Sequence, residues 1–265
     1  MFQVDLNDSV AVITGGSSGI GLATTELFLQ AGASVAICGR NIDRLKEAKA
    51  ILEAKHAGCS LLVEPANVLD ACDMNAFAES VVTRFGRVDM LINNAGQGRI
   101  STFSDTTDEA WLEELELKYF SIIRPTRAFV PLLKDSPAPT IACVNSLLAL
   151  QPEAHMVATS SARAGVLNLV KSLAKELAPH RIRVNSILLG IVESGQWRRR
   201  FEEQAEPGQS WELWTTELAR KKNIPLGRLG KPEEAARALF YLATALSSYT
   251  TGSHIDVSGG NAHHV

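Results

Sequence analysis

The segment HMVATSSARAG, residues 155–165, brings three polar side chains to helical spacing. Thr159 stands four residues before Arg163 and four residues after His155, so the three share one face if the segment is a helix. A threonine hydroxyl and a guanidinium do not exchange protons readily near neutral pH. An imidazole does, because its unperturbed pKa is about 6.5. The segment therefore offers His155 for proton exchange and two groups that can position a ligand.

A glycine-rich segment, TGGSSGIG at residues 14–21, follows an apolar run and precedes a helical pattern. Glycines allow a tight turn, and the start of a helix presents unpaired N–H groups to a phosphate. A glycine cluster alone also fits a purely structural turn, but its place between a strand and a helix favours a pyrophosphate site. The residues assigned to this site are Gly15, Ser17, Ser18, Gly19, Ile20 and Gly21.

Short β-branched runs alternate with helical patterns along the chain. The strands expected are residues 9–14, 34–39, 60–64, 88–93, 140–146, 183–189 and 253–257. The helices expected are residues 19–31, 41–56, 71–85, 108–134, 155–179 and 232–246, with Asp108 and Pro232 at helix starts. The strands carry few charges, as parallel strands covered on both faces do. The alternation predicts an α/β fold with a doubly wound parallel sheet in one domain, residues 1–265.

The composition limits the classes of partner. The 265 residues are 46% hydrophobic and 21% charged, with a net charge of −3, which argues against nucleic acid and anionic membrane surfaces. No apolar run approaches the roughly 20 residues that span a bilayer. The four cysteines lack paired spacing, which is typical of reduced thiols and not of a disulfide framework or a metal site. With no signal-peptide pattern at the N-terminus, we expect a cytoplasmic protein.

Several motifs occur in a familiar order. TGGSSGIG is followed by NNAG at residues 93–96, by Ser146 at the end of the fifth expected strand, and by the tail of residues 224–260. Together they resemble the short-chain dehydrogenase/reductase family over nearly the whole chain. The resemblance implies a three-layer Rossmann-type fold with a seven-stranded sheet and a nicotinamide dinucleotide. It also implies a homotetramer or homodimer built partly through the helices of residues 108–134 and 155–179.

The choice of dinucleotide follows from charge at the end of the second strand. Residue 39 is a glycine, so no carboxylate is there to bind a free ribose 2′-OH, whereas Arg40 can pair with a 2′-phosphate. A solvated arginine is the alternative. NADP(H) is therefore favoured over NAD(H). The resemblance implies further cofactor contacts from Asn67, Val68, Asn94, Ala95, Gly96, Arg163, Gly190, Ile191 and Ser194.

The catalytic positions depart from the family. Its members transfer hydride between a carbonyl and an alcohol with Asn, Ser, Tyr and Lys. Ser146 matches the serine, but Thr159 stands at the tyrosine position, Arg163 at the lysine and Lys118 at the asparagine. A phenol has a pKa of about 10, and a neighbouring cation can lower that pKa toward neutrality. The pKa of a threonine hydroxyl starts several units higher, so the same cation cannot make it a useful acid or base. The usual proton machinery is thus absent. Of the chain's tyrosines, Tyr241 and Tyr249 map away from the nicotinamide, and Tyr119 points about 100° around its expected helix from Lys118.

His155, Lys118 or a water molecule is left to replace the proton donor. His155 has a suitable pKa, and Lys118 could serve if burial lowers its pKa. Each also fits an ordinary role, a histidine at a helix start or a structural hydrogen-bond donor. Ser146 is expected to face the pocket and polarise a carbonyl, with a structural serine at a strand end as the alternative.

An insertion at residues 193–230 is too long for a plain connection and holds Trp197, Trp211, Trp214 and Arg198–Arg200. It is expected to be a substrate lid over a bulky or aromatic small molecule, or else a helical pair on the sheet edge with arginines in solvent.

Three functions remain open from the sequence. The first is an NADP(H)-dependent oxidoreductase with a non-standard proton path. The second is a dinucleotide-binding protein without redox turnover. The third is non-redox chemistry in the same pocket, such as elimination, hydrolysis or carbon–carbon cleavage.

Overall fold

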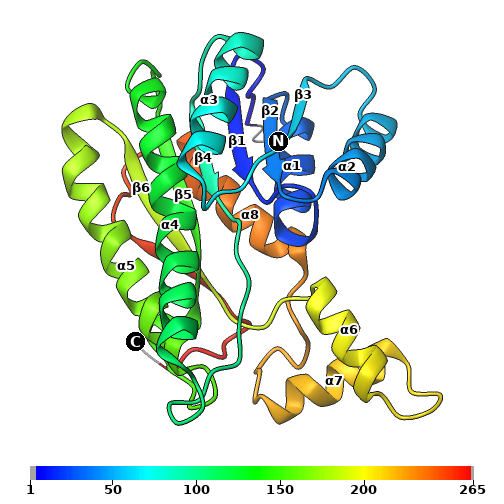
Figure 1. The fold of residues 1–265 in the computed structure, drawn as a ribbon. Helices are drawn as coiled ribbons and strands as arrows, with labels where there is room; N and C mark the ends of the chain where they lie inside the picture. Colours follow the sequence, from blue (N-terminus) through cyan, green and yellow to red (C-terminus); the bar gives the residue numbers. More distant parts are fainter. Residues whose placement is uncertain (1–3, 264–265) are drawn as a thin grey trace.

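Seven parallel strands form one sheet in the order β3-β2-β1-β4-β5-β6-β7 in the computed structural model, which describes residues 4–263 (Figure 1). The strand order reverses between β1 and β4, and ligands of such sheets bind beside the carboxyl ends of the strands at this point. The seven-stranded doubly wound fold is confirmed, and each strand agrees with its expected range within two residues. The strands are β1 Val10–Thr14, β2 Ser34–Gly39, β3 Leu61–Pro65, β4 Met90–Asn93, β5 Thr140–Ser146, β6 Arg183–Leu189 and β7 His254–Val257.

Helices cover both faces of this sheet. Helices α3, α4 and α5 pack on one face and α1, α2 and α8 on the other, whereas α6 and α7 stand away from it (Figure 1). As expected, α4 begins at Asp108 and α8 at Pro232. The helices are α1 Gly19–Gln30, α2 Ile42–Lys55, α3 Ala71–Phe85, α4 Asp108–Leu133, α5 Val157–Leu177, α6 Gly195–Gln204, α7 Trp211–Lys221 and α8 Pro232–Ala243, with short 3₁₀ turns η1 Leu147–Ala149, η2 Ala178–His180 and η3 Ala245–Ser247.

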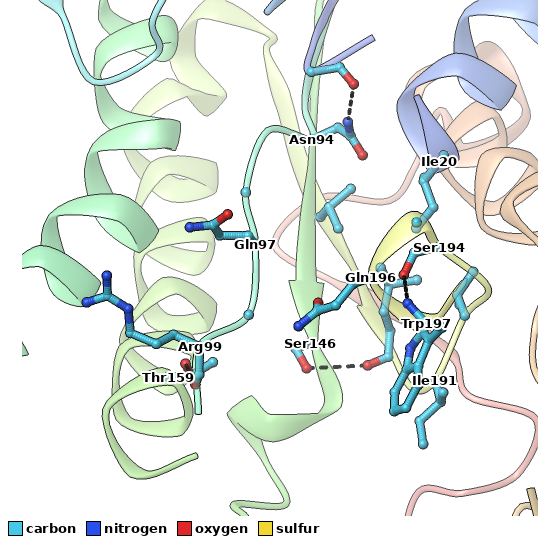
Figure 2. Close-up of a pocket in the computed structure, with 18 of the residues that line it drawn as sticks. Ile20, Asn94, Gln97, Arg99, Ser146, Thr159, Ile191, Ser194, Gln196 and Trp197 are labelled. Atoms are coloured by element: carbon cyan, nitrogen blue, oxygen red, sulfur yellow. Dashed lines mark hydrogen bonds between the residues drawn. The ribbon is translucent and has the colours of Figure 1, made fainter. Parts of the chain in front are cut away.

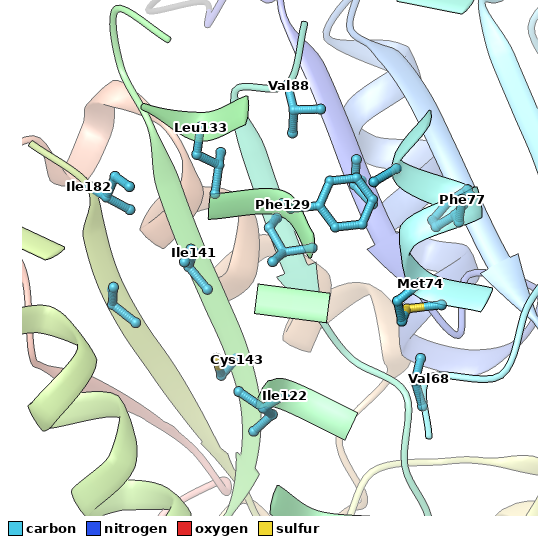
Figure 3. Packing of buried hydrophobic residues seen from close by; sticks show 14 of the residues in the cluster. Val68, Met74, Phe77, Val88, Ile122, Phe129, Leu133, Ile141, Cys143 and Ile182 are labelled. Carbon is cyan, nitrogen blue, oxygen red and sulfur yellow. The ribbon is translucent and has the colours of Figure 1, made fainter. Parts of the chain in front are cut away.

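Strand β1 shows how the sequence produces the two layers. All five of its residues are buried, and their side chains alternate between the faces. Val10 and Val12 join the core under α3–α5, and Ala11 and Ile13 join the core under α1, α2 and α8. On the α3–α5 side, shown in Figure 3, the rings of Phe77 and Phe129 meet edge to face at a centroid distance of 5.8 Å. These cores fix the strand ends that carry the site.

Within residues 4–263, none of the helices combines the length and the apolar character that crossing a membrane requires. The same part of the chain contains no cluster of three or more His, Cys, Asp or Glu side chains arranged to hold a metal ion. Its cysteines are free thiols, with Cys38 and Cys143 buried.

Candidate active site

A cleft of about 1510 Å³ lies along the carboxyl ends of β1, β2, β4, β5 and β6. Drug-sized ligands occupy pockets of about 300–1,000 Å³, so this cleft has room for a dinucleotide together with a substrate. Of the residues predicted to contact a cofactor, every one except Gly21 lines the cleft. Of those predicted for catalysis, Ser146, His155, Thr159 and Arg163 line it, and Lys118 lies behind its wall.

The glycine-rich loop forms a cradle at one end of the cleft. Gly15 and Gly19 have φ values of 68° and 53°, a backbone region that favours glycine. A Cβ atom added at Gly19 would meet nothing within 4 Å, so the loop is open on the side of the cleft. Helix α1 begins there, its N-cap Ser18 makes no side-chain cap, and no acidic residue occupies its first turn. Its free N–H groups therefore fit a bound pyrophosphate.

Asn94 fastens this loop to strand β4. Its Nδ2 donates to the carbonyl oxygens of Thr14 at 3.0 Å and Gly15 at 3.1 Å. In return, the Thr14 hydroxyl accepts from the backbone N–H groups of Asn94 at 3.0 Å and Ala95 at 3.1 Å. The asparagine of NNAG thus holds the shape of the cradle as well as lining the cleft.

Arginines lie at the end of the cleft beside β2. Arg40 is exposed where β2 ends, and Arg44 reaches the same cavity from α2. Within residues 4–263 neither guanidinium has an ion-pair partner, so both are available to a phosphate. Across the cleft, Asn67 Oδ1 accepts from the backbone N–H of Leu69 at 3.1 Å, which leaves its second lone pair for a ligand.

Ser146 lies at the opposite end of the cleft, where β5 ends. Its hydroxyl accepts from the N–H of Leu148 at 3.3 Å and donates to the carbonyl of Leu189 at 3.4 Å. Figure 2 shows Thr159 and Arg99 on one side of Ser146, and Trp197 and Ile191 on the other. A hydrogen bond of 3.4 Å is long, so the Ser146 proton can turn toward a substrate oxygen in the cleft at little cost.

Arg163 approaches the cleft from α5. Its Nη1 donates to the carbonyl of Val144 at 3.0 Å, while its buried Nε has no partner within the described residues. Burial lowers the pKa of the guanidinium to about 10, so Arg163 remains a cation at neutral pH. Arg163 lines the cleft, so its guanidinium is placed to donate to the ribose hydroxyls expected there.

Behind the wall, Lys118 is part of a buried cluster. The side chains of Lys118 and Glu114 are 1% and 2% exposed, and Lys118 Nζ lies 2.6 Å from Glu114 Oε1. The ammonium also donates to the carbonyl of Gln97 at 2.7 Å. The pKa of Lys118 falls to about 8, mainly through burial and then through the charge of Arg163, with Glu114 opposing both. Burial thus lowers this pKa, which is the condition under which Lys118 could serve as a proton donor.

Thr159 joins the cluster to the cleft. Its hydroxyl lies within hydrogen-bond distance of the Glu114 carboxylate and, at 3.2 Å, of the Arg99 carbonyl. Both are acceptors, so the single hydroxyl proton points into the wall and away from the cleft.

The expected place of His155 in a helix is wrong. Helix α5 begins at Val157, and residues 155–157 instead pair with Ser101, whose N–H donates to the His155 carbonyl at 2.9 Å. The imidazole is 52% exposed at the mouth of the cleft, with Nε2 3.2 Å from the carboxylate of Glu153. It therefore lies in solvent and does not share a helix face with Thr159.

Among residues 4–263 no tyrosine lines the cleft. The Tyr119 hydroxyl packs on α5, where a Cβ added at Gly165 would lie 1.6 Å from it. Tyr241 and Tyr249 are exposed on α8 and beyond η3. The catalytic phenol usual in the resembled family thus has no counterpart here.

Residues 9–205 match the sequence model of the short chain dehydrogenase family. The chain belongs to this family. It is an oxidoreductase by class, which confirms the resemblance seen in the motifs.

Related proteins of the family match over nearly their whole length. The 3-oxoacyl-[acyl-carrier-protein] reductase FabG of Thermotoga maritima is 35% identical over 261 residues, covering 96% of this chain and 98% of its own. A short chain oxidoreductase of Pseudomonas aeruginosa PAO1 containing an atypical catalytic center, solved with NADPH bound, is 60% identical with a TM-score of 0.95, covering 98% of this chain and 99% of its own. L-Sorbose reductase of Gluconobacter frateurii, complexed with NADPH and L-sorbose, is 32% identical with a TM-score of 0.93 and full coverage of both chains, 100% each.

In this dehydrogenase, residues 193–230 form the helices α6 and α7 around an aromatic cluster. The rings of Trp211 and Trp214 stack with their centroids 5.8 Å apart, and the ring centroid of Trp197 lies 6.3 Å from that of Trp214. Two of the arginines stack on these rings. The guanidinium carbon of Arg198 lies 3.7 Å from the ring centroid of Trp211, and that of Arg200 lies 4.6 Å from the ring centroid of Trp197. Trp197 and Trp214 also line the cleft, which places aromatic surface beside the substrate end.

Several residues of the site are absent from those predicted from the sequence. Arg44, Gln97, Arg99 and Gln196 line the cleft, and Glu114 lies behind it. Glu114 carries a signal that was available, because it stands one helical turn before Lys118, the spacing of an ion pair on one helix face. The loop residues Gln97 and Arg99 carry no periodicity that could have marked them.

Proposed function

We propose that the protein is an NADP(H)-dependent oxidoreductase that interconverts a carbonyl and an alcohol. The observation that carries this proposal is one continuous cleft with Arg40 and the open α1 N-terminus at one end and Ser146 and Arg163 at the other. The NADPH complexes of the P. aeruginosa and G. frateurii relatives support the choice of cofactor. When bound, the nicotinamide supplies the hydride acceptor or donor of the reaction.

Each part of the cleft has a task toward the dinucleotide. Arg40 and Arg44 hold the 2′-phosphate, and the loop from Gly15 to Gly21 holds the pyrophosphate through its backbone N–H groups. Asn67 and Val68 border the adenine. Toward the nicotinamide lie Asn94, Ala95, Gly96, Arg163, Gly190, Ile191 and Ser194.

Ser146 and Lys118 have different roles in reduction of the carbonyl. Ser146 donates a hydrogen bond to the carbonyl oxygen, which orients and polarises it. Lys118 is the proton source, because burial lowers its pKa to about 8: it is still protonated at neutral pH and close enough to that pKa to give the proton up. Arg163 keeps a fixed positive charge beside the cofactor and moves no proton.

His155 has no part in this proton path. We expect His155→Ala to keep the rate of carbonyl reduction within about a factor of three and to leave its pH profile unchanged, since an exposed imidazole at the cleft mouth is worth far less than the 10²–10⁴ of a positioned acid. Steady-state rates of NADPH oxidation between pH 5 and 9, with Glu153→Gln as the matched control, measure this. A loss of about 10²-fold would return His155 to the mechanism.

The substrate end indicates a bulky or aromatic small molecule. Trp197 and Trp214 supply flat apolar surface there, and α6 and α7 are the lid over it. The remaining sequence predictions stand as part of the proposal: one dinucleotide-binding domain with this lid, a homotetramer or homodimer, and a cytoplasmic location.

The test of the function is a panel of aromatic and aliphatic ketones and aldehydes assayed with NADPH. Stoichiometric NADPH oxidation and alcohol formation are expected with at least one bulky carbonyl. NADPH binding without turnover on any member would instead support a dinucleotide-binding protein. A product formed without oxidation of NADPH would support non-redox chemistry.

The proposed cofactor preference has its own expected result. Arg40→Gln should weaken NADPH binding about 10- to 100-fold and leave NADH binding nearly unchanged, since hydrogen bonds to a charged group are worth about 1.5–3 kcal/mol. Fluorescence titration of both cofactors measures the effect. The matched control is Arg237→Gln, an exposed arginine on α8 outside the cleft. Equal losses for NADPH and NADH would show that Arg40 does not read the 2′-phosphate.

A further inference from the structure

Glu114 is a buried carboxylate that the fold alone does not require. It is 2% exposed on the inner face of α4, beside the buried polar side chains of Lys118 and Thr159. Burying an ionised carboxylate costs several kcal/mol unless it is paired and hydrogen-bonded. Glu114 meets both conditions, through Lys118 on its own helix and Thr159 on α5.

The charges around this carboxylate come from three elements. Lys118 lies on α4 and Arg163 on α5, while Arg99 comes from the loop after β4 and pairs outward with Glu113 at 2.8 Å. Arg163 and Arg99 both lower the pKa of Lys118, and Glu114 raises it. Glu114 also raises the pKa of Arg163. Among residues 4–263, Glu114 is the buried anion that offsets these cations, so it keeps Lys118 charged at neutral pH.

Glu114 bonds one residue that lines the cleft and one that does not. Thr159 lines the cleft, whereas Lys118 does not. Both bond the same atom, Glu114 Oε1. Both groups donate to Oε1, so this oxygen lies between the buried ammonium and the Thr159 hydroxyl at the cleft wall. It can pass a proton from one to the other once the Thr159 hydrogen turns toward the cleft.

We propose that Glu114 is a positioning residue that joins Lys118 and Thr159 into one proton-transfer unit. This inference rests on the proposed carbonyl reduction. Hydride adds to the carbonyl carbon, and the carbonyl oxygen becomes an alkoxide. The Thr159 hydroxyl turns from Glu114 Oε1 toward that oxygen, its O–H bond breaks, and the proton forms the O–H bond of the alcohol. The Lys118 N–H bond breaks as its proton forms an O–H bond with Glu114 Oε1, and that O–H bond breaks in turn as Oε1 gives the proton to the Thr159 oxygen. Lys118 is left neutral and takes a proton from water, so the substrate gains one proton and the protein none.

The unit explains how Thr159 can stand at a tyrosine position. A threonine hydroxyl by itself is neither an acid nor a base near neutral pH. As a bridge it needs no shifted pKa, because it gives one proton and receives another in the same step. The acidity comes from Lys118, and Glu114 supplies the connection.

Glu114→Gln tests this inference, because glutamine keeps the shape and removes the charge. We expect kcat for carbonyl reduction to fall at least about tenfold, toward the 10²–10⁴ of lost acid catalysis. In the wild type the rate should fall as the pH rises through about 8, the pKa of Lys118. In the variant this fall should move to lower pH, because Arg163 still lowers the pKa of Lys118 and Glu114 no longer raises it. The matched control is Glu109→Gln, an exposed glutamate in the first turn of α4, which should change neither. An unmoved pH profile with normal kcat would overturn the inference.

A second measurement needs no turnover. The nicotinamide ring carries a positive charge in NADP⁺ and none in NADPH. Without Glu114, the cations Lys118 and Arg163 should weaken NADP⁺ binding relative to NADPH, and we expect the ratio of their Kd values to rise several-fold in Glu114→Gln but not in Glu109→Gln. If the wild type reduces no carbonyl but this ratio rises, the proposed function fails while the charge role of Glu114 holds. An unchanged ratio in a folded variant refutes that role.

Glu114→Asp covers the case in which the glutamine variant does not fold. The shorter carboxylate keeps the charge near Lys118 but withdraws from Thr159. In Glu114→Asp the rate should still decline near the wild-type pH, and the ratio of the Kd values for NADP⁺ and NADPH should stay at the wild-type value. The kcat should nevertheless fall at least about tenfold. A wild-type kcat in this variant would show that the link to Thr159 is not used.

Discussion

Lys118→Met is expected to reduce the rate of carbonyl reduction by about 10²–10⁴-fold, the usual contribution of a positioned general acid. The methionine is of similar length and fills the same buried space, but it has no proton to give. In the wild type the ammonium is the active form, so the rate should be high at neutral pH and fall as the pH rises through about 8. In the direction of alcohol oxidation the neutral amine is the active form, so the dependence should reverse. Lys118→Met should abolish both dependences.

Two controls separate the loss of the proton from the loss of structure. Removing Lys118 leaves Glu114 buried without its cation, which costs about 3–5 kcal/mol of stability. The double variant Lys118→Met/Glu114→Leu removes that unpaired charge and should recover most of the melting temperature without recovering activity. Lys118→Arg keeps the charge but cannot release its proton near neutral pH, so it should also be slow. A fast Lys118→Arg enzyme would show that the charge alone is required.

The frame of this protein was predictable because burial dominates it. Strand β5, Thr140–Ser146, was expected at those bounds, since a run of apolar residues without charge suits a strand covered on both faces. Ser146 ends that strand and lines the cleft, and it was the family resemblance that predicted this serine to face the pocket. Helix α4 was placed by its periodicity despite Pro125 and Pro131 in its interior. The hydrophobic pattern along the sequence was sufficient to predict these elements, because burial alone determines where they lie.

The catalytic end was less predictable because contacts distant in sequence decide it. His155 seemed to continue the helical pattern of α5, but the bridge between Ser101 and Met156 keeps its backbone out of the helix. The expectation that Lys118 could donate a proton directly took no account of depth. Its side chain is 1% exposed, and its ammonium donates to the carbonyl of Gln97, which comes from the loop after β4. Spacing along one helix gives the face of a residue, not what covers that face.

The lid shows both outcomes in one segment. Three tryptophans in residues 193–230 suggested an aromatic cover, and two of them, Trp197 and Trp214, do line the cleft. The sequence did not indicate that the arginines would stack on the rings. That arrangement depends on how α6 crosses α7, which no local pattern encodes.

Gly21→Ala is expected to abolish high-affinity NADPH binding, with a loss of about 100-fold or more in Kd, although Gly21 does not line the cleft. A Cβ at this position would lie 2.1 Å from the carbonyl oxygen of Gly15 and 2.5 Å from Asn94 Nδ2. Both atoms belong to the hydrogen bonds that fasten the phosphate loop to β4. Relief of the clash must therefore displace the loop or break those bonds, at about 1–3 kcal/mol for overpacking of this kind, with the lost phosphate contacts in addition.

A matched glycine exists at the start of another helix beside the same cleft. A Cβ at Gly195, the first residue of α6, would find its nearest neighbour in the flexible end of Arg199 at 3.6 Å, an ordinary contact. Gly195→Ala should therefore bind NADPH with nearly the wild-type Kd in a fluorescence titration, while Gly21→Ala does not. Circular dichroism and melting temperatures show whether Gly21→Ala remains folded. A folded Gly21→Ala protein that binds NADPH normally would mean that the loop does not hold the pyrophosphate, because the cradle could then change shape without consequence for the ligand.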